Sequence, residues 1–169
     1  SYHGEYSGSV VIPPSFTYLG ATFSVTSIGE AAFYKCSDLA ELEGLEYLNT
    51  SNVTSMAEMF RECASLKTID VNNFDMTNVT DVNHMFFDCY VLTTIYCDNT
   101  WNIANSTSMF TYDTKLVGAV RYNSNFQDCS MANPTTGYFT GKWDINLSSD
   151  FENGTVTCEN TWAYTNDFP

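Results

Sequence analysis

The chain has 169 residues, of which 44% are hydrophobic, 15% aromatic and 15% charged, and its net charge is −14. This length suits one domain with a continuous core, and the hydrophobic share excludes a disordered polymer. Because a polyanion repels phosphate groups, the charge excludes binding to nucleic acids and attraction to anionic membranes. No stretch of the sequence approaches the ~18 consecutive apolar residues that a membrane-spanning helix requires.

The strongest pattern in the sequence is a repeat that occurs in four copies, at residues 25–39, 52–66, 78–92 and 102–116. Copies 2 and 3 align without a gap, copy 1 is one residue longer, and copy 4 has diverged. They share the skeleton Val-Thr-x-(Met/Ile/Val), followed by Met-Phe-x-x-Cys-x-x-Leu. Because a unit this short cannot bury its apolar side alone, the copies are expected to stack and share one core.

Two elements are predicted within each copy and the residues that follow it. In copy 2, Val53, Met56, Met59 and Phe60 are spaced as on one face of a helix, which predicts a short helix or helical turn. The alternating segment at residues 66–71 predicts a short strand, and successive strands would pair in parallel about 4.8 Å apart. The repeated ring and thiol positions predict a core ladder made of Phe33, Phe60, Phe86, Phe110, Cys36, Cys63 and Cys89.

Residues 141–169 lie beyond the repeats and follow a different pattern. Trp143, Ile145 and Leu147 alternate with polar residues, residues 155–158 form a second strand-like run, and the turn signal Asn-Gly stands between the two. These features predict a β-hairpin that covers the exposed end of the stack, because an open end exposes apolar surface and unpaired strand edges.

The repeats resemble the BspA-like leucine-rich repeats of bacterial surface proteins. The unit of that family reads roughly Leu-x-x-Leu-Asp-x-Ser-x-Phe-Asp-Thr-Ser-x-Val-Thr-x-Met-x-x-Met-Phe-x-x-Cys, and residues 66–89 follow it. The opening segment, with Ile12-Pro13, Ile28-Gly29 and Ala32-Phe33, is similar to a sister version of the repeat. Residues 116–140 look like the tail that often follows the last repeat.

This resemblance implies both a fold and a function. The fold would be a leucine-rich-repeat-like solenoid over residues 1–140, with parallel β-strands stacked coil on coil and short helical turns. Residues 141–169 would form a C-terminal β cap of the same domain. The function would be that of a secreted or cell-surface module for adhesion or ligand recognition, with a protein or glycan ligand and without a cofactor.

Two other functions compete with this interpretation. A structural subunit could assemble end to end into a filament or surface layer, through self-association of the first coil near Val10-Val11-Ile12. An unrecognised hydrolase is the second alternative, but no catalytic set can be named: the chain has two histidines, His3 and His84, and no nucleophile elbow or phosphate loop. We therefore expect a protein without enzymatic activity, without membrane insertion and without a nucleic-acid partner.

The cysteines and acidic residues leave several interpretations open. The column Cys36, Cys63 and Cys89 predicts buried, soft core side chains, with a metal or redox site as the alternative. One disulfide among Cys97, Cys129 and Cys158 is plausible in a secreted protein. The acidic segment at residues 144–153 could bind calcium, although it lacks the ligand spacing of a known calcium-binding loop.

Six Asn-x-Ser/Thr sequences would be glycan acceptors only in a eukaryotic host, at Asn49, Asn52, Asn78, Asn105, Asn146 and Asn153. Asn52 and Asn78 also belong to the repeat, where the Asn amide and Thr hydroxyl are expected to satisfy backbone groups at the start of the helical turn.

A candidate binding face is predicted where the copies differ from one another. Aromatic residues that do not follow the core positions gather around copies 3 and 4. Clusters of exposed aromatic rings are typical of contact surfaces, although the same rings could instead fill the irregular fourth coil. The predicted face consists of Phe87, Tyr90, Tyr96, Trp101 and Tyr112.

Overall fold

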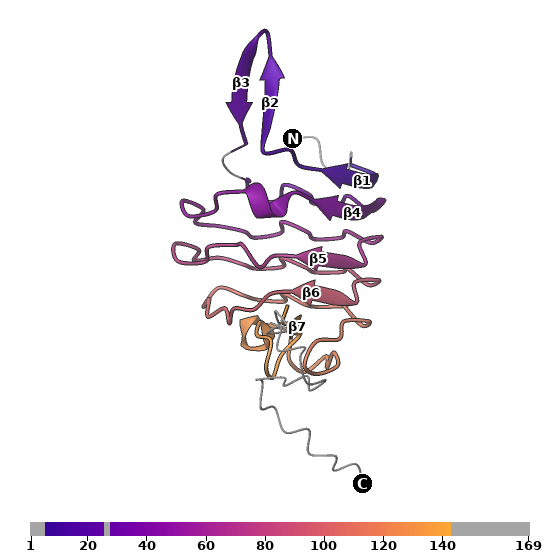
Figure 1. Ribbon diagram of the computed structural model, residues 1–169. Coiled ribbons are helices and arrows are strands. Elements are labelled where there is room, and N and C mark those ends of the chain that lie inside the picture. Colours follow the sequence, from indigo (N-terminus) through magenta and orange to yellow (C-terminus); the bar gives the residue numbers. More distant parts are fainter. Residues whose placement is uncertain (1–5, 26–27, 143–169) are drawn as a thin grey trace, which may run out of the picture.

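A computed structural model describes residues 6–25 and 28–142 as a stack of chain turns, with a hairpin at one end (Figure 1). Short strands follow one another along the stack, and within the described residues the only helices are two single 3₁₀ turns. The elements are β1 (Gly8–Val11), β2 (Ser15–Tyr18), β3 (Ala21–Ser24), β4 (Leu39–Glu43), η1 (Leu45–Tyr47), β5 (Thr68–Asp70), β6 (Thr94–Tyr96), η2 (Cys129–Met131) and β7 (Phe139–Thr140).

Parallel pairing connects the strands of successive turns. β1 pairs in parallel with β4, and the sheet β5-β6-β7 is parallel throughout. Ile69 is opposite Ile95, and Ile95 is opposite Phe139, so one column of large apolar side chains runs through the sheet. The tail beyond copy 4 therefore contributes a strand to the same sheet as the repeats. β2 and β3 form the antiparallel hairpin that projects from the first turn (Figure 1).

Tight turns, and not helices, occupy the Val-Thr-x-Met-x-x-Met-Phe segments, so the predicted helical turns are wrong. In copy 2, Met59 N–H donates to the carbonyl of Met56 at 3.3 Å, and Cys63 N–H donates to the carbonyl of Phe60 at 3.1 Å. Glu58 and Glu62, the third residue of each turn, have φ angles of 57° and 61°. A positive φ at this position defines a type II turn. Consecutive four-residue turns bury the same i, i+3 and i+4 positions as a helix, which explains the misleading spacing.

A ladder of backbone hydrogen bonds connects the turn segments of neighbouring copies, and we call it the turn ladder. In copy 2, alternate N–H groups donate to carbonyls of copy 3: Met56 to Asp81, Glu58 to Asn83, Phe60 to Met85 and Glu62 to Phe87, all at 2.8–2.9 Å. Copy 1 donates to copy 2 and copy 3 to copy 4 in the same direction. The intervening N–H groups close the type II turns, so each turn segment uses its backbone donors both locally and between copies.

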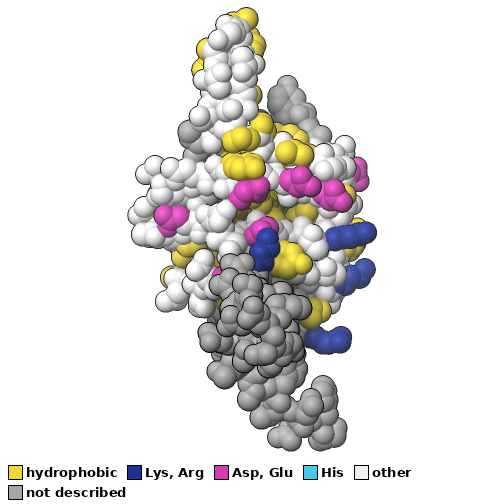
Figure 2. Space-filling view, viewed as in Figure 1, with side chains coloured by type: hydrophobic (Ala, Val, Ile, Leu, Met, Phe, Trp, Pro, Cys, Tyr) yellow, Lys and Arg dark blue, Asp and Glu magenta, His cyan; other side chains and the backbone are white. Residues whose placement is uncertain are grey.

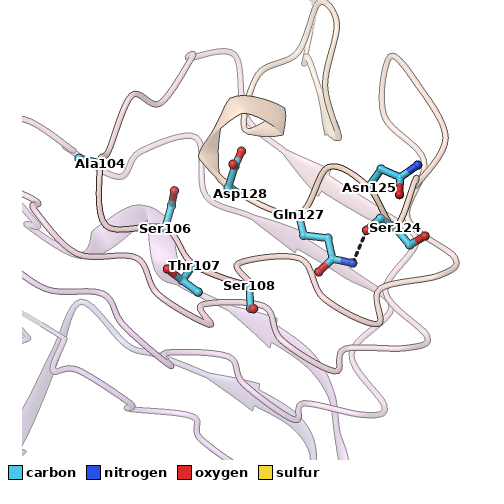
Figure 3. Close-up of a pocket in the computed structure, with 8 residues that line it drawn as sticks. All are labelled: Ala104, Ser106, Thr107, Ser108, Ser124, Asn125, Gln127 and Asp128. Carbon is cyan, nitrogen blue, oxygen red and sulfur yellow. Dashed lines mark hydrogen bonds between the residues drawn. The ribbon is translucent and has the colours of Figure 1, made fainter.

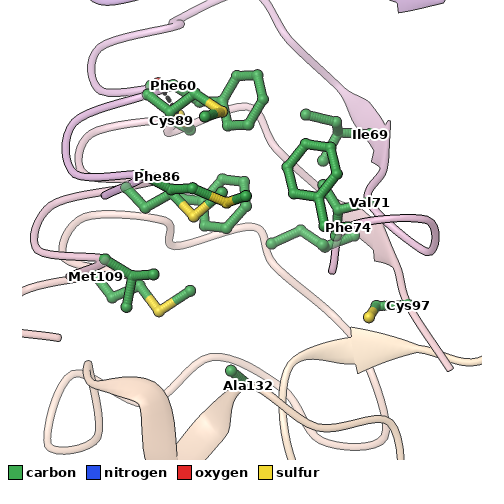
Figure 4. Packing of buried hydrophobic residues seen from close by; sticks show 14 of the residues in the cluster. Phe60, Ile69, Val71, Phe74, Phe86, Cys89, Cys97, Met109 and Ala132 are labelled. Atoms are coloured by element: carbon green, nitrogen blue, oxygen red, sulfur yellow. Dashed lines mark hydrogen bonds between the residues drawn. The ribbon is translucent and has the colours of Figure 1, made fainter. Parts of the chain in front are cut away.

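The core lies between the turn segments on one side and the strands on the other (Figure 4). Phe33, Phe60, Phe86 and Phe110 stack face to face, with ring centroids 5.6–5.8 Å apart and interplanar angles of 4–11°. Cys36, Cys63 and Cys89 are buried beside them. The Cys63 thiol donates to the carbonyl of Phe33 at 3.1 Å, and the Cys89 thiol donates to that of Phe60 at 3.0 Å. The thiol column thus adds a second set of bonds between copies.

The predicted C-terminal cap lies mostly outside the described residues, because the description ends at Lys142. The β7 strand pairs with β6 before that point. Within the described part of the chain, the end of the sheet is formed by residues 139–140, and the proposed hairpin of residues 141–169 stays a prediction.

Replacing Phe86 by Ala should lower the free energy of unfolding by about 3–5 kcal/mol, because the ring fills a slot between Phe60 and Phe110 that neighbours cannot close. Phe126→Ala is the matched control, since Phe126 is an exposed ring, and it should change stability by less than about 0.5 kcal/mol. Urea denaturation followed by circular dichroism measures both. Equal midpoints for the two variants would contradict the stacked core.

Candidate functional site

The five residues of the predicted binding face do not share one surface. Phe87 and Tyr112 contact each other edge to face, with centroids 5.3 Å apart, on the turn side of the stack. Tyr96 lies on β6, on the strand side. Trp101 is only 2% exposed and packs against Phe139 at 4.9 Å, so it belongs to the core and not to a binding face. Tyr90 is 50% exposed.

A column of rings and one guanidinium group crosses the outer surface of the turn side, and we call it the aromatic column: Tyr34, Arg61, Phe87 and Tyr112. The Arg61 guanidinium lies 5.4 Å from the Tyr34 ring and 5.0 Å from the Phe87 ring. Phe87 in turn contacts Tyr112 and the His84 ring. Rings and a cation stack in this way because the cation is attracted to the negative face of each ring.

Charged neighbours hold the middle of the aromatic column in place. Arg61 pairs with Glu58 at 2.8 Å and with Glu62 at 3.3 Å, and Lys35 lies 3.9 Å from Glu62. Phe87 is half-buried, whereas Tyr112 remains 58% exposed. The repeat spacing placed Tyr34, Arg61 and Phe87 in one column, because each directly follows a phenylalanine of the core. By spacing the fourth member of that column is Thr111, whereas in the structure the ring that contacts Phe87 is the neighbouring Tyr112.

An open polar hollow of about 380 Å³ lies beside the turn segment of copy 4 (Figure 3). One wall is the chain from Ala104 to Ser108, and the other is the tail at residues 124–128. Within the tail wall, Gln127 donates to the carbonyl of Ser124 at 2.6 Å. An adjoining hollow of about 480 Å³ shares Ala104, Ser106 and Asp128. The repeat pattern gave no signal for this site, because the second wall comes from the non-repeating tail.

Asp128 is the acidic group in this hollow. Its carboxylate accepts the N–H of Ser130 at 2.9 Å, at the start of η2. Hydrogen bonding from Ser130 lowers the pKa of Asp128 below its usual value, so the group is negatively charged at neutral pH. The hollow therefore combines hydroxyl and amide groups with one negative charge.

Exposed apolar side chains gather on the projecting hairpin (Figure 2). Phe16 and Phe23 face each other across β2 and β3 with centroids 5.5 Å apart, and they are 52% and 46% exposed. Leu19 stands in the tight turn with a φ of 49° and is 88% exposed. Val11 of the neighbouring edge strand β1 is also exposed. Two strands alone are marginally stable in water, so an apolar surface of this kind is unusual without a partner.

The five cysteines that the structure describes are buried thiols. Cys36, Cys63, Cys89, Cys97 and Cys129 are free in the structure, and Cys158 lies outside the described residues. Burial raises the pKa of Cys63 to about 12 and that of Cys97 to about 11, and it raises the pKa of Cys89 well above its usual value. Because the thiolate is the reactive form, these side chains are poor nucleophiles and metal ligands.

Within the described residues, no group of three or more His, Cys, Asp or Glu side chains could hold a metal ion. The acidic segment at residues 144–153 lies outside them.

Asp113 replaces the cysteine of the thiol column in copy 4, three residues after Phe110. It is fully buried, and its Oδ1 accepts the N–H of Cys89 at 2.9 Å. Its Oδ2 has no hydrogen-bond partner within the described structure. Burial raises the pKa of Asp113 well above its usual value, with a smaller contribution from the negative charge of Asp88. A neutral acid at this position can act as a donor, as the thiols of copies 2 and 3 do.

Four of the predicted glycan acceptors are exposed: Asn49, Asn52, Asn78 and Asn105. The amide nitrogen of Asn78 donates to the carbonyl of Ser51 at 2.7 Å, and the Thr80 hydroxyl donates to that of Thr54 at 3.2 Å. At Asn78 the Asn-Val-Thr sequence therefore connects two copies, instead of satisfying the start of a helical turn. Asn146 and Asn153 lie outside the described residues.

Comparison with known proteins shows the family of the chain. Residues 21–122, more than half of the sequence, match the family described as Mycoplasma protein of unknown function, DUF285. The chain belongs to this family. No curated protein and no solved structure matches the sequence. The matched region of this DUF285 protein begins at β3 and includes all of copies 1 to 4.

None of the helices in the described parts of this DUF285 protein is long and apolar enough to cross a membrane.

Replacing Asp113 by Asn should flatten the dependence of stability on pH. The folded-state pKa of Asp113 is raised, so the protonated acid stabilises the fold fully below the unfolded pKa of about 4. This stability is lost as the pH rises toward the folded pKa, with a slope of up to about 1.4 kcal/mol per pH unit. Asn keeps the acceptor for Cys89 N–H and does not ionise, so at pH 7 the variant should be more stable than the parent by about 1–3 kcal/mol.

Chemical denaturation between pH 4 and pH 8 measures this effect. Asp38→Asn is the matched control, because Asp38 is exposed and its side chain is not buried in the thiol column. Parallel pH profiles for the parent and Asp113→Asn would show that Asp113 is not a buried neutral acid.

Proposed function

We propose that this DUF285 protein is a non-enzymatic recognition module, of the BspA-like leucine-rich-repeat type, which works at a cell surface. The repeat of about 26 residues, the stacked phenylalanines and the parallel strands support a leucine-rich-repeat-like solenoid as the fold. The neutral thiols of the core offer no activated nucleophile, because burial raises the pKa of Cys63 to about 12. Extended, rigid outer surfaces are what stacked repeats supply to their partners.

The aromatic column is the observation that carries this proposal. Stacking orders three rings and one guanidinium group on the surface, and Tyr112 remains largely exposed at one end. Aromatic and arginine side chains dominate the binding energy of many interfaces, because they bury a large area with little loss of conformational freedom. The ligand would be a protein segment or a glycan that lies across copies 3 and 4.

Replacing Tyr90 and Tyr112 together by Ser tests this proposal. Both rings are exposed, so the melting temperature should stay within a few degrees of the parent. Ligands selected with the parent from a random peptide display library and from a glycan array should bind the double variant at least tenfold more weakly, which corresponds to about 1.4 kcal/mol.

Tyr47→Ser is the matched control for this experiment, because Tyr47 is an exposed tyrosine of η1, outside the repeat copies. It should bind like the parent. Equal binding of all three proteins would place the recognition surface elsewhere than the aromatic column.

The projecting hairpin favours a second candidate function, namely assembly of subunits end to end. The hairpin and the edge strand β1 lie at the same end of the stack (Figure 1), and both expose apolar side chains. β1 pairs only with β4 among the described strands, so its other edge is available for pairing. A second subunit that covers this end would bury the exposed rings and extend the stack.

Replacing Phe16 and Phe23 by Ser should then abolish self-association. If the second function holds, sedimentation velocity of the parent should show species that grow with concentration, and the double variant should remain a monomer. Phe126→Ser, a control at an exposed ring elsewhere, should behave like the parent. A parent that stays monomeric over the range from 1 to 100 μM, a range of weak to moderate affinities, would rule out this mode of assembly.

A further inference from the structure

The turn ladder stops at copy 4, beside the polar hollow. Val82 N–H donates to the carbonyl of Asn105 at 2.8 Å, and His84 N–H donates to that of Thr107 at 3.0 Å. The corresponding residues of copy 4 are Ser106 and Ser108. In the part of the chain that the structure describes, the N–H groups of these two serines have no hydrogen-bond partner. Both residues line the hollow (Figure 3).

The tail continues only half of the ladder. Phe110 N–H donates to the carbonyl of Gln127 at 3.0 Å, and Tyr112 N–H donates to the Tyr122 hydroxyl at 3.3 Å. The tail thus supplies acceptors to the backbone opposite Phe110 and Tyr112. At Ser106 it bonds to the side chain instead, because Cys129 N–H donates to the Ser106 hydroxyl oxygen at 3.1 Å. The N–H groups of Ser106 and Ser108 are left beside the hollow of about 380 Å³, and the missing partner there is a pair of carbonyl groups.

We propose that this hollow binds an extended peptide segment of a partner protein, which adds one more rung to the turn ladder. The partner's carbonyls, two residues apart, accept the N–H groups of Ser106 and Ser108, as the carbonyls of Asn105 and Thr107 accept those of Val82 and His84. Addition of a peptide strand to an open backbone edge is a general mode of peptide recognition, in which main-chain hydrogen bonds supply the affinity.

The chemistry of the walls selects among ligands. Asp128 is charged, and the whole chain carries a net charge of −14, so an anionic ligand is repelled and a segment with a Lys or Arg beside the two carbonyls is favoured. The 380 Å³ hollow has no aromatic side chain in its lining on which a sugar ring could stack, and Trp101 in the adjoining hollow is buried. The lining therefore favours a peptide over a saccharide.

This site goes beyond the proposed function, because it lies apart from the aromatic column and binds the partner's main chain instead of its side chains. One set of variants distinguishes the hollow from the aromatic column. Tyr90→Ser with Tyr112→Ser leaves the walls of the hollow unchanged, whereas Ala104→Trp fills the hollow and leaves the aromatic column unchanged.

The experiment uses peptides selected on the parent protein from a library of random linear peptides, together with amide hydrogen exchange measured by NMR. In the free protein, the amides of Ser106 and Ser108 should exchange faster than those of Val82 and His84, which are bonded to copy 4. Addition of a selected peptide should slow exchange at Ser106 and Ser108 at least tenfold. Ala104→Trp should weaken peptide binding at least tenfold, whereas the control Ala119→Trp, at an exposed alanine outside the hollow, should not.

Thr107→Trp is the second blocking variant, at an exposed residue of the same wall, and it decides the matter if Ala104→Trp does not fold. The proposal is overturned by selected peptides that leave exchange at Ser106 and Ser108 unchanged. It is equally overturned if blocking and control variants bind alike, or if oligosaccharides and not peptides slow exchange at these two amides.

Discussion

Backbone hydrogen bonding between copies is the constraint on which the rest of the structure depends. Each turn segment directs alternate N–H groups to the next copy and closes type II turns with the others. This arrangement requires a positive φ at the third residue of each turn, which Glu58, Glu62, His84 and Asp88 all adopt without being glycine. Such angles cost energy for residues with a side chain. The stack offsets that cost, because the same geometry aligns the phenylalanine rings at 5.6–5.8 Å and brings the thiols of Cys63 and Cys89 to carbonyls of the preceding copy.

The surfaces available for function follow from this constraint. Side chains that point inward are buried in the core, so a partner can contact only the outward-facing positions and the two ends of the stack. In copies 1 to 3 the aromatic column uses the position directly after the core phenylalanine, and Arg61 joins the rings of neighbouring copies. The ends differ in character, since one carries the apolar hairpin and the other the polar hollow beside Asp128. A partner would therefore meet three chemically distinct surfaces on a small protein.

Much of the core could be predicted from the sequence, because repetition reveals which positions are equivalent. Phe33, Phe60, Phe86 and Phe110, with the three column cysteines, are buried where their spacing placed them. The local backbone could not be predicted in the same way, since type II turns and helices bury the same positions of copy 2. Trp101 was misplaced because it lies just before copy 4, outside the aligned positions, and its packing partner Phe139 belongs to the non-repeating tail. The hollow could not be predicted from the sequence, because it lies between copy 4 and the non-repeating tail and depends on how these two segments pack together. The classification of the stack as a BspA-like solenoid stays a prediction.

The single direction of the turn ladder has an electrostatic consequence. Alternate N–H groups of the turn segments point from copy 1 toward copy 4, whereas Thr80 N–H points back to the carbonyl of Thr54. Most peptide dipoles of the turn ladder therefore add together, as they do along a helix. The positive end of this sum lies at Ser106 and Ser108, and the negative end lies at the first copy. A chain with a net charge of −14 thus presents partial positive charge at one edge, next to the carboxylate of Asp128. The stack therefore carries a net dipole along its axis, and a partner can distinguish its two ends by their electrostatic field alone.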